Sequence, residues 1–346
     1  MGASDVETAT GAPVRLDAPA LWWISGSGIE SRSIAEIPAL LERDDGFLWL
    51  DLPSCDDTAT GLLRDLFGFH SHAIRDCREK RRIPKIHTYA DYVFVILHDL
   101  EFEEGGWGHL VELDQFVGER YLVTVHGPLN PHVPPEAAFR QTGTTARRIH
   151  AGTFHPRTPA QLGHGIVSTL ALHLEELVAT IADRIAQHER SIVRAETGDP
   201  QEVLEQLFQL RHQLLLIRTA ASLSREVFAG RATVARSSVS PERLAIIEDI
   251  TDQYERLSRL CDAEKVFLDQ VLEFHQARTV TKMNVAMERL ALIAAVLLPV
   301  TAISSIYGMN VIVNGRTDFA HIAVVLVFMG VVVALMLRWA KRQGWW

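Results

Sequence analysis

The feature that most constrains this chain is a long uncharged stretch near its C-terminus. No charged side chain occurs between Arg289 and Arg316, and residues 290–310 are almost all apolar. About 20 apolar residues in a helix cross the roughly 30 Å hydrocarbon core of a bilayer. A helix this apolar could also lie inside a large soluble core. A second apolar run, residues 319–337, interrupted only by His321, favours the membrane, because two such runs joined by a short loop form a hairpin of spans.

The charges that flank the two runs predict their orientation. Lys282 and Arg289 precede the first run, whereas three basic residues follow the second, and the loop between the runs carries one Arg and one Asp. An excess of Lys and Arg marks the cytoplasmic side. Both termini are therefore expected in the cytoplasm. The predicted segments are a first transmembrane helix over 284–310, an external loop over 311–318, a second transmembrane helix over 319–338 and a cytoplasmic basic tail over 339–346.

Composition excludes several classes of protein. The net charge of −9 and the absence of a basic stripe argue against a nucleic-acid partner. Three cysteines far apart, without a CxxC or Cys/His spacing, indicate reduced cytosolic thiols. The N-terminal residues resemble neither a secretory signal nor a transit peptide, so membrane insertion is expected to depend on the C-terminal hairpin. No HExxH, GxSxG or P-loop motif occurs, and an enzyme is not expected.

The part before the spans divides into two regions by pattern. Residues 1–20 are small and polar and predict a disordered tail. Residues 21–156 alternate short β-rich runs with a helical pattern at 56–67, which predicts a cytoplasmic α/β domain. The β-rich runs begin at Leu21, Phe47, Tyr92, Leu110 and Arg120.

Residues 157–283 predict a helical domain and stalk. Apolar residues recur at helical spacing over 162–196, a second helix is expected over 201–228, and the Ser- and Arg-rich residues 230–240 are expected to form a loop. A third helix then runs from Pro241 into the first span without a break before Pro299. A helix of nearly 60 residues would extend roughly 85–90 Å. Such a helix needs partners, which indicates an oligomeric stalk.

The end of the first span carries a specific signature. Residues 307–310 read Tyr-Gly-Met-Asn, which resembles the YGMN signature of the CorA family of divalent-cation channels. The cytoplasmic half follows the same family order, with FLWLDLP from Phe47, FHSHAIRDCREKRRIPK from Phe69 and ERYLVTVHG from Glu119. The resemblance implies an α+β membrane protein with a CorA-like funnel: a cytoplasmic α/β domain, a long helical stalk and two C-terminal transmembrane helices. It also implies a homopentamer in the bacterial inner membrane that takes up Mg²⁺, with Co²⁺ as a further candidate ion.

A stripe on the predicted pore helix is the candidate ion pathway. Its members follow spacings of three, four and seven: Glu273, Asn284, Met287, Ala294, Leu298, Thr301 and Ser305. Asn284 and Thr301 are polar where packing alone would favour Leu or Val. The simpler alternative is an Asn that sets the register of a helical bundle. The resemblance favours pore lining, with Met287, Leu298 and Leu290 as rings of a hydrophobic gate.

The signature itself is the candidate selectivity filter. Mg²⁺ gives up its hydration water reluctantly. A ring of Asn310 carboxamides and Gly308 carbonyls, flanked by Tyr307 and Met309, would hydrogen-bond the water of a hydrated ion without removing it. The alternative is an ordinary helix C-terminus, where Gly and Asn are preferred.

Two acidic residues are implied as regulatory metal ligands. Asp76 and Asp249 match positions at which CorA channels bind Mg²⁺ between subunits. Without the resemblance, each would be taken as a solvated surface carboxylate. The expected metal is therefore Mg²⁺, both transported and regulatory, with no organic cofactor, and the expected partners are further copies of the chain, the bilayer and divalent cations.

Several departures from the family pattern keep two alternatives open. The loop after the signature lacks the usual acidic residues, and Arg316 balances Asp318. Arg75 and Ile83 also differ from the residues common at their positions. A zinc or other transition-metal transporter of the related ZntB branch is the first alternative; Met309 argues against it, and His321 would be its candidate proton or zinc group. A membrane-anchored scaffold or sensor is the second.

Overall fold

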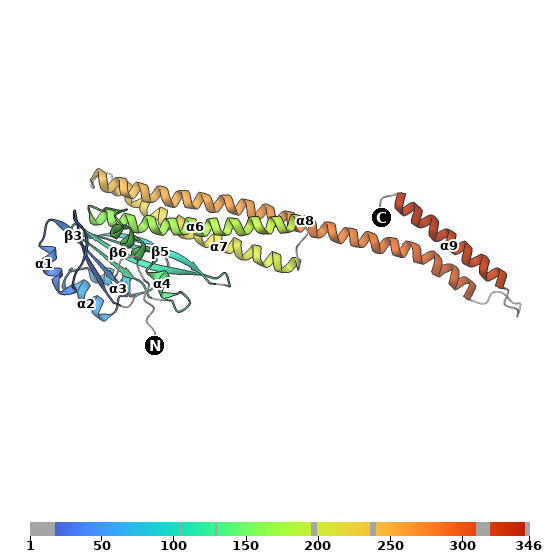
Figure 1. Ribbon diagram of the computed structural model, residues 1–346, viewed down its shortest axis with the longest axis horizontal. Helices are drawn as coiled ribbons and strands as arrows, with labels where there is room; N and C mark the ends of the chain where they lie inside the picture. Colours follow the sequence, from blue (N-terminus) through green and yellow to red (C-terminus); the bar gives the residue numbers. More distant parts are fainter. Residues whose placement is uncertain are drawn as a thin grey trace. The chain divides into compact units, whose positions relative to one another are not determined.

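A computed structural model of the chain describes residues 18–103, 105–128, 130–194, 199–235, 240–308 and 319–342 (Figure 1). The chain divides into two compact units, with the boundary between Asp269 and Gln270. Most of the predicted N-terminal tail, residues 1–17, lies outside the described residues. The predicted tail extends too far, because Ala20 already belongs to the first strand.

The larger unit is built on a mixed seven-stranded sheet of order β2-β1-β3-β7-β6-β5-β4, in which only β3 and β7 pair in parallel. All five predicted strands are confirmed. The strands are β1 Ala20–Ser25, β2 Gly28–Ser31, β3 Gly46–Leu52, β4 Lys85–Thr88, β5 Tyr92–Phe102, β6 Gly108–Gly118 and β7 Tyr121–His126. The two strands that the sequence did not predict, β2 and β4, are the two edges, where short exposed strands carry little hydrophobic pattern.

Helices cover both faces of the sheet. Neighbouring strand residues point to opposite faces, and so Trp23 and Leu48 belong to one core whereas Trp22 and Trp49 belong to the other. The first core is closed by η1 Ile34–Glu36, α1 Ile37–Leu41, α2 Asp57–Asp65 and α3 Ser71–Arg78. The second core is closed by α5 Arg140–His150 and α6 Pro159–Arg194, and the short helix α4 Pro135–Ala138 packs on β6. The resulting three layers confirm the predicted α/β domain.

Three long helices follow, as the sequence predicts: α6, then α7 Pro200–Ala235 and α8 Pro241–Gly308. The helix α6 is long and apolar enough to cross a membrane, but 44% of its most apolar segment is buried inside the chain. The predicted loop over 230–240 is wrong in its first half, because α7 continues to Ala235. An internal glycine such as Gly230 costs a helix only about 1 kcal/mol, and the buried neighbours Phe228 and Ala232 hold the helix in place.

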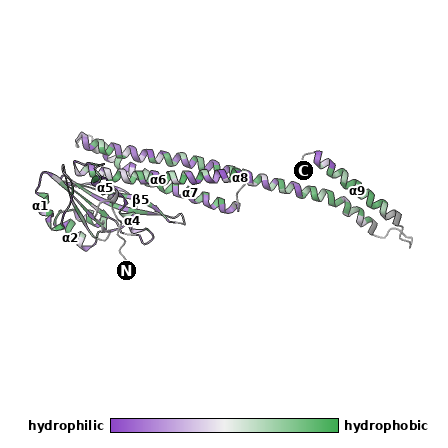
Figure 2. Cartoon of the chain, viewed as in Figure 1, coloured by the Kyte–Doolittle hydropathy of each residue, from purple (hydrophilic) through white to green (hydrophobic). Residues whose placement is uncertain are grey.

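The smaller unit holds the part of α8 that starts at Gln270 and one further helix, and these match the two predicted spans. The helix α8 is 68 residues long with Pro299 inside it, and α9 covers Phe319–Arg342. Both are apolar over the lengths that a bilayer requires, as the hydropathy colouring shows (Figure 2), and their apolar segments are 0% and 6% buried. The predicted external loop, 311–318, and the last residues of the basic tail, 343–346, lie outside the described residues. The helix α9 extends to Arg342, into the predicted tail.

Candidate functional site

The predicted pore stripe lies on the second half of α8, and the helix is unbroken from Glu273 to Gly308. From Asn284 the stripe advances to Ser305 through Met287, Ala294, Leu298 and Thr301, an average of 3.5 residues per turn. Such a seven-residue repeat keeps one face of a helix toward a common axis when several copies wind around each other. Leu290 lies on one side of the line between Met287 and Ala294. The stripe is therefore a continuous face of one helix.

The side chains of this stripe are uncovered in the isolated chain. Five of its small or polar members are exposed: Glu273, Asn284, Ala294, Thr301 and Ser305. The apolar members are exposed to a degree that is unfavourable in water: Met287 is 52% exposed, Leu290 66% and Leu298 67%. Each square ångström of apolar surface left in water costs roughly 25 cal/mol. The face of α8 therefore needs cover from the lipid bilayer or from another chain.

The polar stripe residue Thr301 hydrogen-bonds within its own helix. Its hydroxyl donates to the carbonyl of Leu297 at 2.9 Å. The hydroxyl proton is thereby fixed on the helix, and the lone pairs of the oxygen point away and can accept hydrogen bonds from water. A ring of such groups presents acceptor oxygens to the water around a cation.

The signature follows directly on the end of the pore helix. Tyr307 and Gly308 are the last two residues of α8. Met309 and Asn310 lie outside the described residues, and so their predicted filter role stays a prediction.

The carboxylate of Asp76 is buried and paired, unlike a solvated surface carboxylate. Asp76 lies on α3 and is 5% exposed. Arg81 Nη2 donates to Asp76 Oδ1 at 2.6 Å, and Lys85 Nζ donates to Asp76 Oδ2. Burial raises the pKa of this carboxyl, but the hydrogen bond from Lys85 and the positive charges of Lys85, Arg81 and Arg75 outweigh it and hold the pKa below its ordinary value. Asp76 is therefore an anion whose two oxygens already have cationic partners.

Asp249 has a different environment. It lies near the start of α8 with its side chain 54% exposed. Its Oδ2 is 2.6 Å from His164 Nε2 and accepts a hydrogen bond from Gln253 Nε2 at 2.7 Å. Within the described residues, no group of three or more His, Cys, Asp or Glu side chains could hold a metal ion. A metal ion at Asp76 or Asp249 would need water or another chain to complete its ligands.

The sequence did not reveal a buried acidic cluster beside Asp76. Asp114 is fully buried on β6, and neither of its carboxylate oxygens has a hydrogen-bond partner among the described residues. Burial and the neighbouring Glu112 raise the pKa of Asp114 well above its ordinary value. Burial also raises the pKa of Glu112 to about 7, and the backbone N–H of Arg81 donates to its Oε2 at 2.7 Å. Glu112 therefore exchanges its proton near neutral pH, and Asp114 keeps its proton to a higher pH than an exposed aspartic acid does.

Two polar pairs lie inside the larger unit, one within the sheet and one between the sheet and its helices. His126 Nε2 lies 2.9 Å from Asp51 Oδ1, and His173 Nδ1 lies 2.9 Å from Asp99. Gln141 also donates to Asp99. The first pair joins β3 to β7 within the sheet, whereas the contacts of Asp99 join β5 to α5 and α6. We interpret both pairs as structural.

Comparison with known proteins identifies the family. The family model described as "CorA-like Mg2+ transporter protein" matches residues 44–342. The chain belongs to the CorA-like Mg²⁺ transporter family. It is therefore a membrane protein that transports divalent metal ions and is not an enzyme, as the sequence predicted.

Individual relatives agree with this assignment. The chain is 27% identical to the putative metal ion transporter YfjQ of Bacillus subtilis, over 88% of this chain and 91% of that protein. It is 22% identical to the cobalt/magnesium transport protein CorA of Thermotoga maritima, over 81% of this chain and 78% of that protein.

Solved structures confirm the fold. The complete CorA magnesium transporter of Methanocaldococcus jannaschii superposes with a TM-score of 0.75 at 17% identity, covering 94% of this chain and 98% of that chain. The cytoplasmic domain of ZntB from Vibrio parahaemolyticus gives a TM-score of 0.57 at 11% identity, covering 76% of this chain and 98% of that chain. The predicted architecture of a soluble α/β domain, a long helix and C-terminal apolar helices is thus confirmed.

Proposed function

We propose that this transporter is a homopentameric Mg²⁺ channel of the bacterial inner membrane, with both termini in the cytoplasm and α8 lining the pore. The observation that carries the proposal is the exposed stripe on α8. Polar side chains interrupt an apolar face at Asn284, Thr301 and Ser305, and the same face ends at the signature. A plain membrane anchor has no need for these polar groups. Five symmetric copies would bring the stripes together around one axis, and each stripe would cover the others.

Selection in the proposed pore is by hydrated size and neutral oxygen ligands. The span contains no carboxylate between Arg289 and Arg316. Removing the tightly held water of Mg²⁺ would require strong anionic ligands. A ring formed by Gly308 and Asn310, flanked by Tyr307 and Met309, would instead accept and donate hydrogen bonds to the ion's own water. Glu273, at the cytoplasmic end of the stripe, would raise the local cation concentration there.

The proposed gate is apolar. The apolar positions lie together between the polar residues Asn284 and Thr301 and would form successive hydrophobic rings: Met287, Leu290, Ala294 and Leu298. A narrow apolar ring excludes water and so blocks a hydrated ion, whereas a slight widening lets water return. Gating would therefore need only small movements of α8.

Cytosolic Mg²⁺ is proposed to regulate this gate by bridging Asp76 of one copy and Asp249 of the next. The donor chemistry fits Mg²⁺, which prefers carboxylate oxygens and water. The site is weakened in this chain, because Lys85 and Arg81 already bind the Asp76 oxygens. The ion would have to compete with Lys85, whose side chain is 46% exposed and so is free to move away. Low internal Mg²⁺ would leave the bridge empty and favour the open state.

Zinc is the second candidate cargo. The likeness to the ZntB cytoplasmic domain and the neutral loop, in which Arg316 balances Asp318, both favour it. Co²⁺ is a third candidate, since the Thermotoga maritima relative is named a cobalt/magnesium transport protein. Ion competition in the transport assay separates the three.

A pair of neighbouring serines tests the pore face. Ser305 belongs to the stripe, whereas Ser304, one residue away and also exposed, points about 100° around the helix. In a Cys55→Ser background, Ser305→Cys should make Mg²⁺ flux sensitive to a charged thiol reagent, and Ser304→Cys should not. Equal sensitivity of the two variants, or a Ser305→Cys variant that is less sensitive than Ser304→Cys, would contradict the assignment of this face to the pore.

A further inference from the structure

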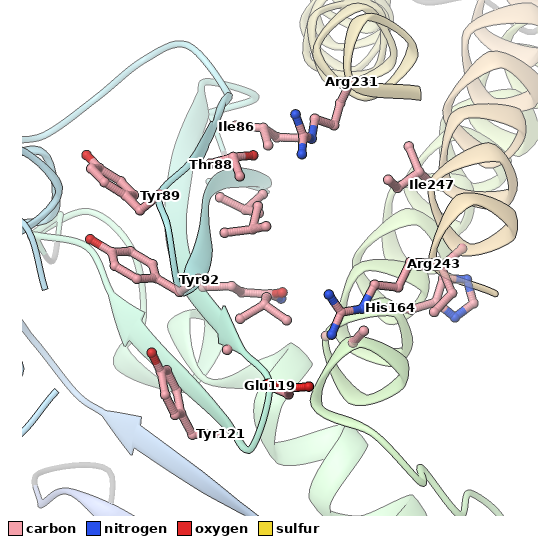
Figure 3. A pocket seen from close by; sticks show the side chains of 18 of the residues that line it. Ile86, Thr88, Tyr89, Tyr92, Glu119, Tyr121, His164, Arg231, Arg243 and Ile247 are labelled. Atoms are coloured by element: carbon pink, nitrogen blue, oxygen red, sulfur yellow. The ribbon is translucent and has the colours of Figure 1, made fainter. Parts of the chain in front are cut away.

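A cavity of about 750 Å³ lies within the larger unit, between the sheet and the long helices. Figure 3 shows strand residues such as Ile86 and Thr88 on one side, and Arg231, Arg243 and Ile247 of the helices on the other. Its walls come from β4, β5 and β6 and from α6, α7 and the first turns of α8. None of the proposed pore or regulatory residues that the structure describes lines it. The cavity therefore has no role in the proposed ion pathway.

The inner lining is aliphatic on both sides. Strand and helix residues contribute β-branched side chains: Val93, Val95, Val117, Val167, Ile246, Ile247 and Ile250. Ligand cavities in proteins commonly hold roughly 300–1,000 Å³, with apolar walls and a few convergent polar groups. The size and lining of this cavity suit the apolar body of a small organic molecule.

The helix side of the cavity is cationic. Arg231 on α7 and Arg243 on α8 both direct their guanidinium groups into the cavity (Figure 3). Neither guanidinium has a hydrogen-bond or ion-pair partner among the described residues. A third arginine, Arg120, also lines the cavity, and its Nη2 is buried without a partner in the described chain. Planar guanidinium groups match the oxygens of carboxylates and phosphates.

The remaining polar groups orient such a ligand. Asp91 and Glu119 line the cavity from turns of the sheet, and they would repel an anionic head and direct it toward the helices. His164 is held by Asp249 at 2.6 Å. Gln115 is 2% exposed, and its Nε2 has no partner among the described residues. A buried amide N–H without a partner is unfavourable, and a ligand oxygen would satisfy it after a small side-chain rotation.

We propose that this cavity binds a single-chain organic acid. The aliphatic chain would lie against the valines and isoleucines, and an acidic head would lie between Arg231 and Arg243. A fatty carboxylate and an alkyl phosphate share this chemistry. The ligand would contact the first turns of α8, between Arg243 and Ile250, and so would stabilise the packing of this helix on the sheet.

Photocrosslinking of the full chain in lipid nanodiscs tests the proposal. The probe is decanoate with a diazirine on its alkyl chain, and labelled peptides are identified by mass spectrometry. Labelling is expected on the peptides that hold Val93–Val95 and Ile246–Ile250, and unlabelled decanoate should compete. Arg231→Gln with Arg243→Gln should weaken binding by roughly 30-fold or more, because two charge-assisted hydrogen-bonding groups are lost. Arg259→Gln, on the same helix outside the cavity, should leave labelling unchanged.

Further arms separate the possible outcomes. Octyl phosphate that competes better than decanoate would assign a phosphate head, and the reverse would assign a carboxylate. Decanol, which has no charge, should compete poorly. If the double arginine variant does not fold, Ile247→Trp should abolish labelling by filling the cavity. The proposal is overturned if these peptides are not labelled, if decanol competes as well as decanoate, or if labelling survives in a folded arginine or Ile247→Trp variant.

Discussion

The strongest perturbation of the proposed regulation is the removal of the amine that competes for Asp76. In Lys85→Gln, Asp76 keeps Arg81 as a partner but loses the hydrogen bond from Lys85. The 5% exposed carboxylate then has one oxygen without a cationic partner. A hydrogen bond to a charged group contributes about 1.5–3 kcal/mol when buried. Because the Lys85 side chain is 46% exposed, solvent screening reduces its contribution to about 1 kcal/mol.

In the wild type, a bridging Mg²⁺ has to displace Lys85 from Asp76 and so must overcome this free energy. In Lys85→Gln it does not. A change of 1.4 kcal/mol is tenfold in affinity, and so about 1 kcal/mol corresponds to roughly fivefold. The concentration of internal Mg²⁺ that halves transport should therefore fall about fivefold in Lys85→Gln. Mg²⁺-sensitive dye uptake into proteoliposomes with buffered internal Mg²⁺ measures this concentration. Asp76→Asn should have the opposite effect and nearly abolish inhibition.

Lys80→Gln is the matched control, because Lys80 is a neighbouring basic residue that does not hydrogen-bond Asp76. It should change the inhibition little. An unchanged half-inhibiting concentration in Lys85→Gln, with Asp76→Asn also unaffected, would refute the reasoning that internal Mg²⁺ acts at this carboxylate.

Two further predictions concern the soluble unit. Folding raises the pKa of Glu112 from 4.5 to about 7, so that between these pH values the folded chain holds a proton that the unfolded chain has released. The stability that the protonated Glu112 allows is fully present below pH 4.5 and is lost as the pH rises through 7. Glu112→Gln should therefore stabilise the fold more at pH 8 than at pH 5, by up to about 3 kcal/mol in the free energy of unfolding. The thermal unfolding temperature at the two pH values measures this, and an equal shift at both would contradict it. Gly46→Ala should destabilise the larger unit, because an added Cβ would lie 2.4 Å from the Ile24 carbonyl oxygen. Gly61→Ala on α2 should stabilise it by up to about 1 kcal/mol, because the added Cβ would meet only an ordinary contact with Asp65. Thermal unfolding of the two variants in one detergent compares them.

The parts of the fold that the sequence predicted are those with a strong local pattern. The strands beginning near Phe47 and Tyr92 are rich in β-branched, aromatic and aliphatic residues, and most of their residues are buried. The strand β4, Lys85–Thr88, has three residues that are exposed and no apolar alternation, so nothing local distinguishes it from a loop. The helix α3, Ser71–Arg78, is short and mostly polar, and it forms because Ala73, Ile74 and Cys77 pack against the sheet.

The environment of the candidate regulatory residues was the least predictable part. Around Asp76 the sequence has many charges, which in isolation indicates a solvated surface. The carboxylate of Asp76 is paired where it is buried because Lys85, the first residue of β4, donates a hydrogen bond to it. Asp114 and Glu112 alternate with apolar residues on β6, a pattern that predicts a solvated strand face, but β6 is a central strand covered on both sides. The burial of these carboxylates depends on long-range packing, which no local sequence pattern predicts.

Mg²⁺ uptake into proteoliposomes by the wild-type protein and by Asn310→Ala tests the central claim most directly. Asn314→Ala is the matched control, an asparagine only four residues later in the predicted external loop. We predict Mg²⁺ uptake by the wild type, loss of uptake in Asn310→Ala, retention in Asn314→Ala and weaker competition by Zn²⁺ than by Co²⁺. Full uptake in Asn310→Ala, or no uptake of any of these ions by folded wild-type protein with internal Mg²⁺ removed, would contradict it.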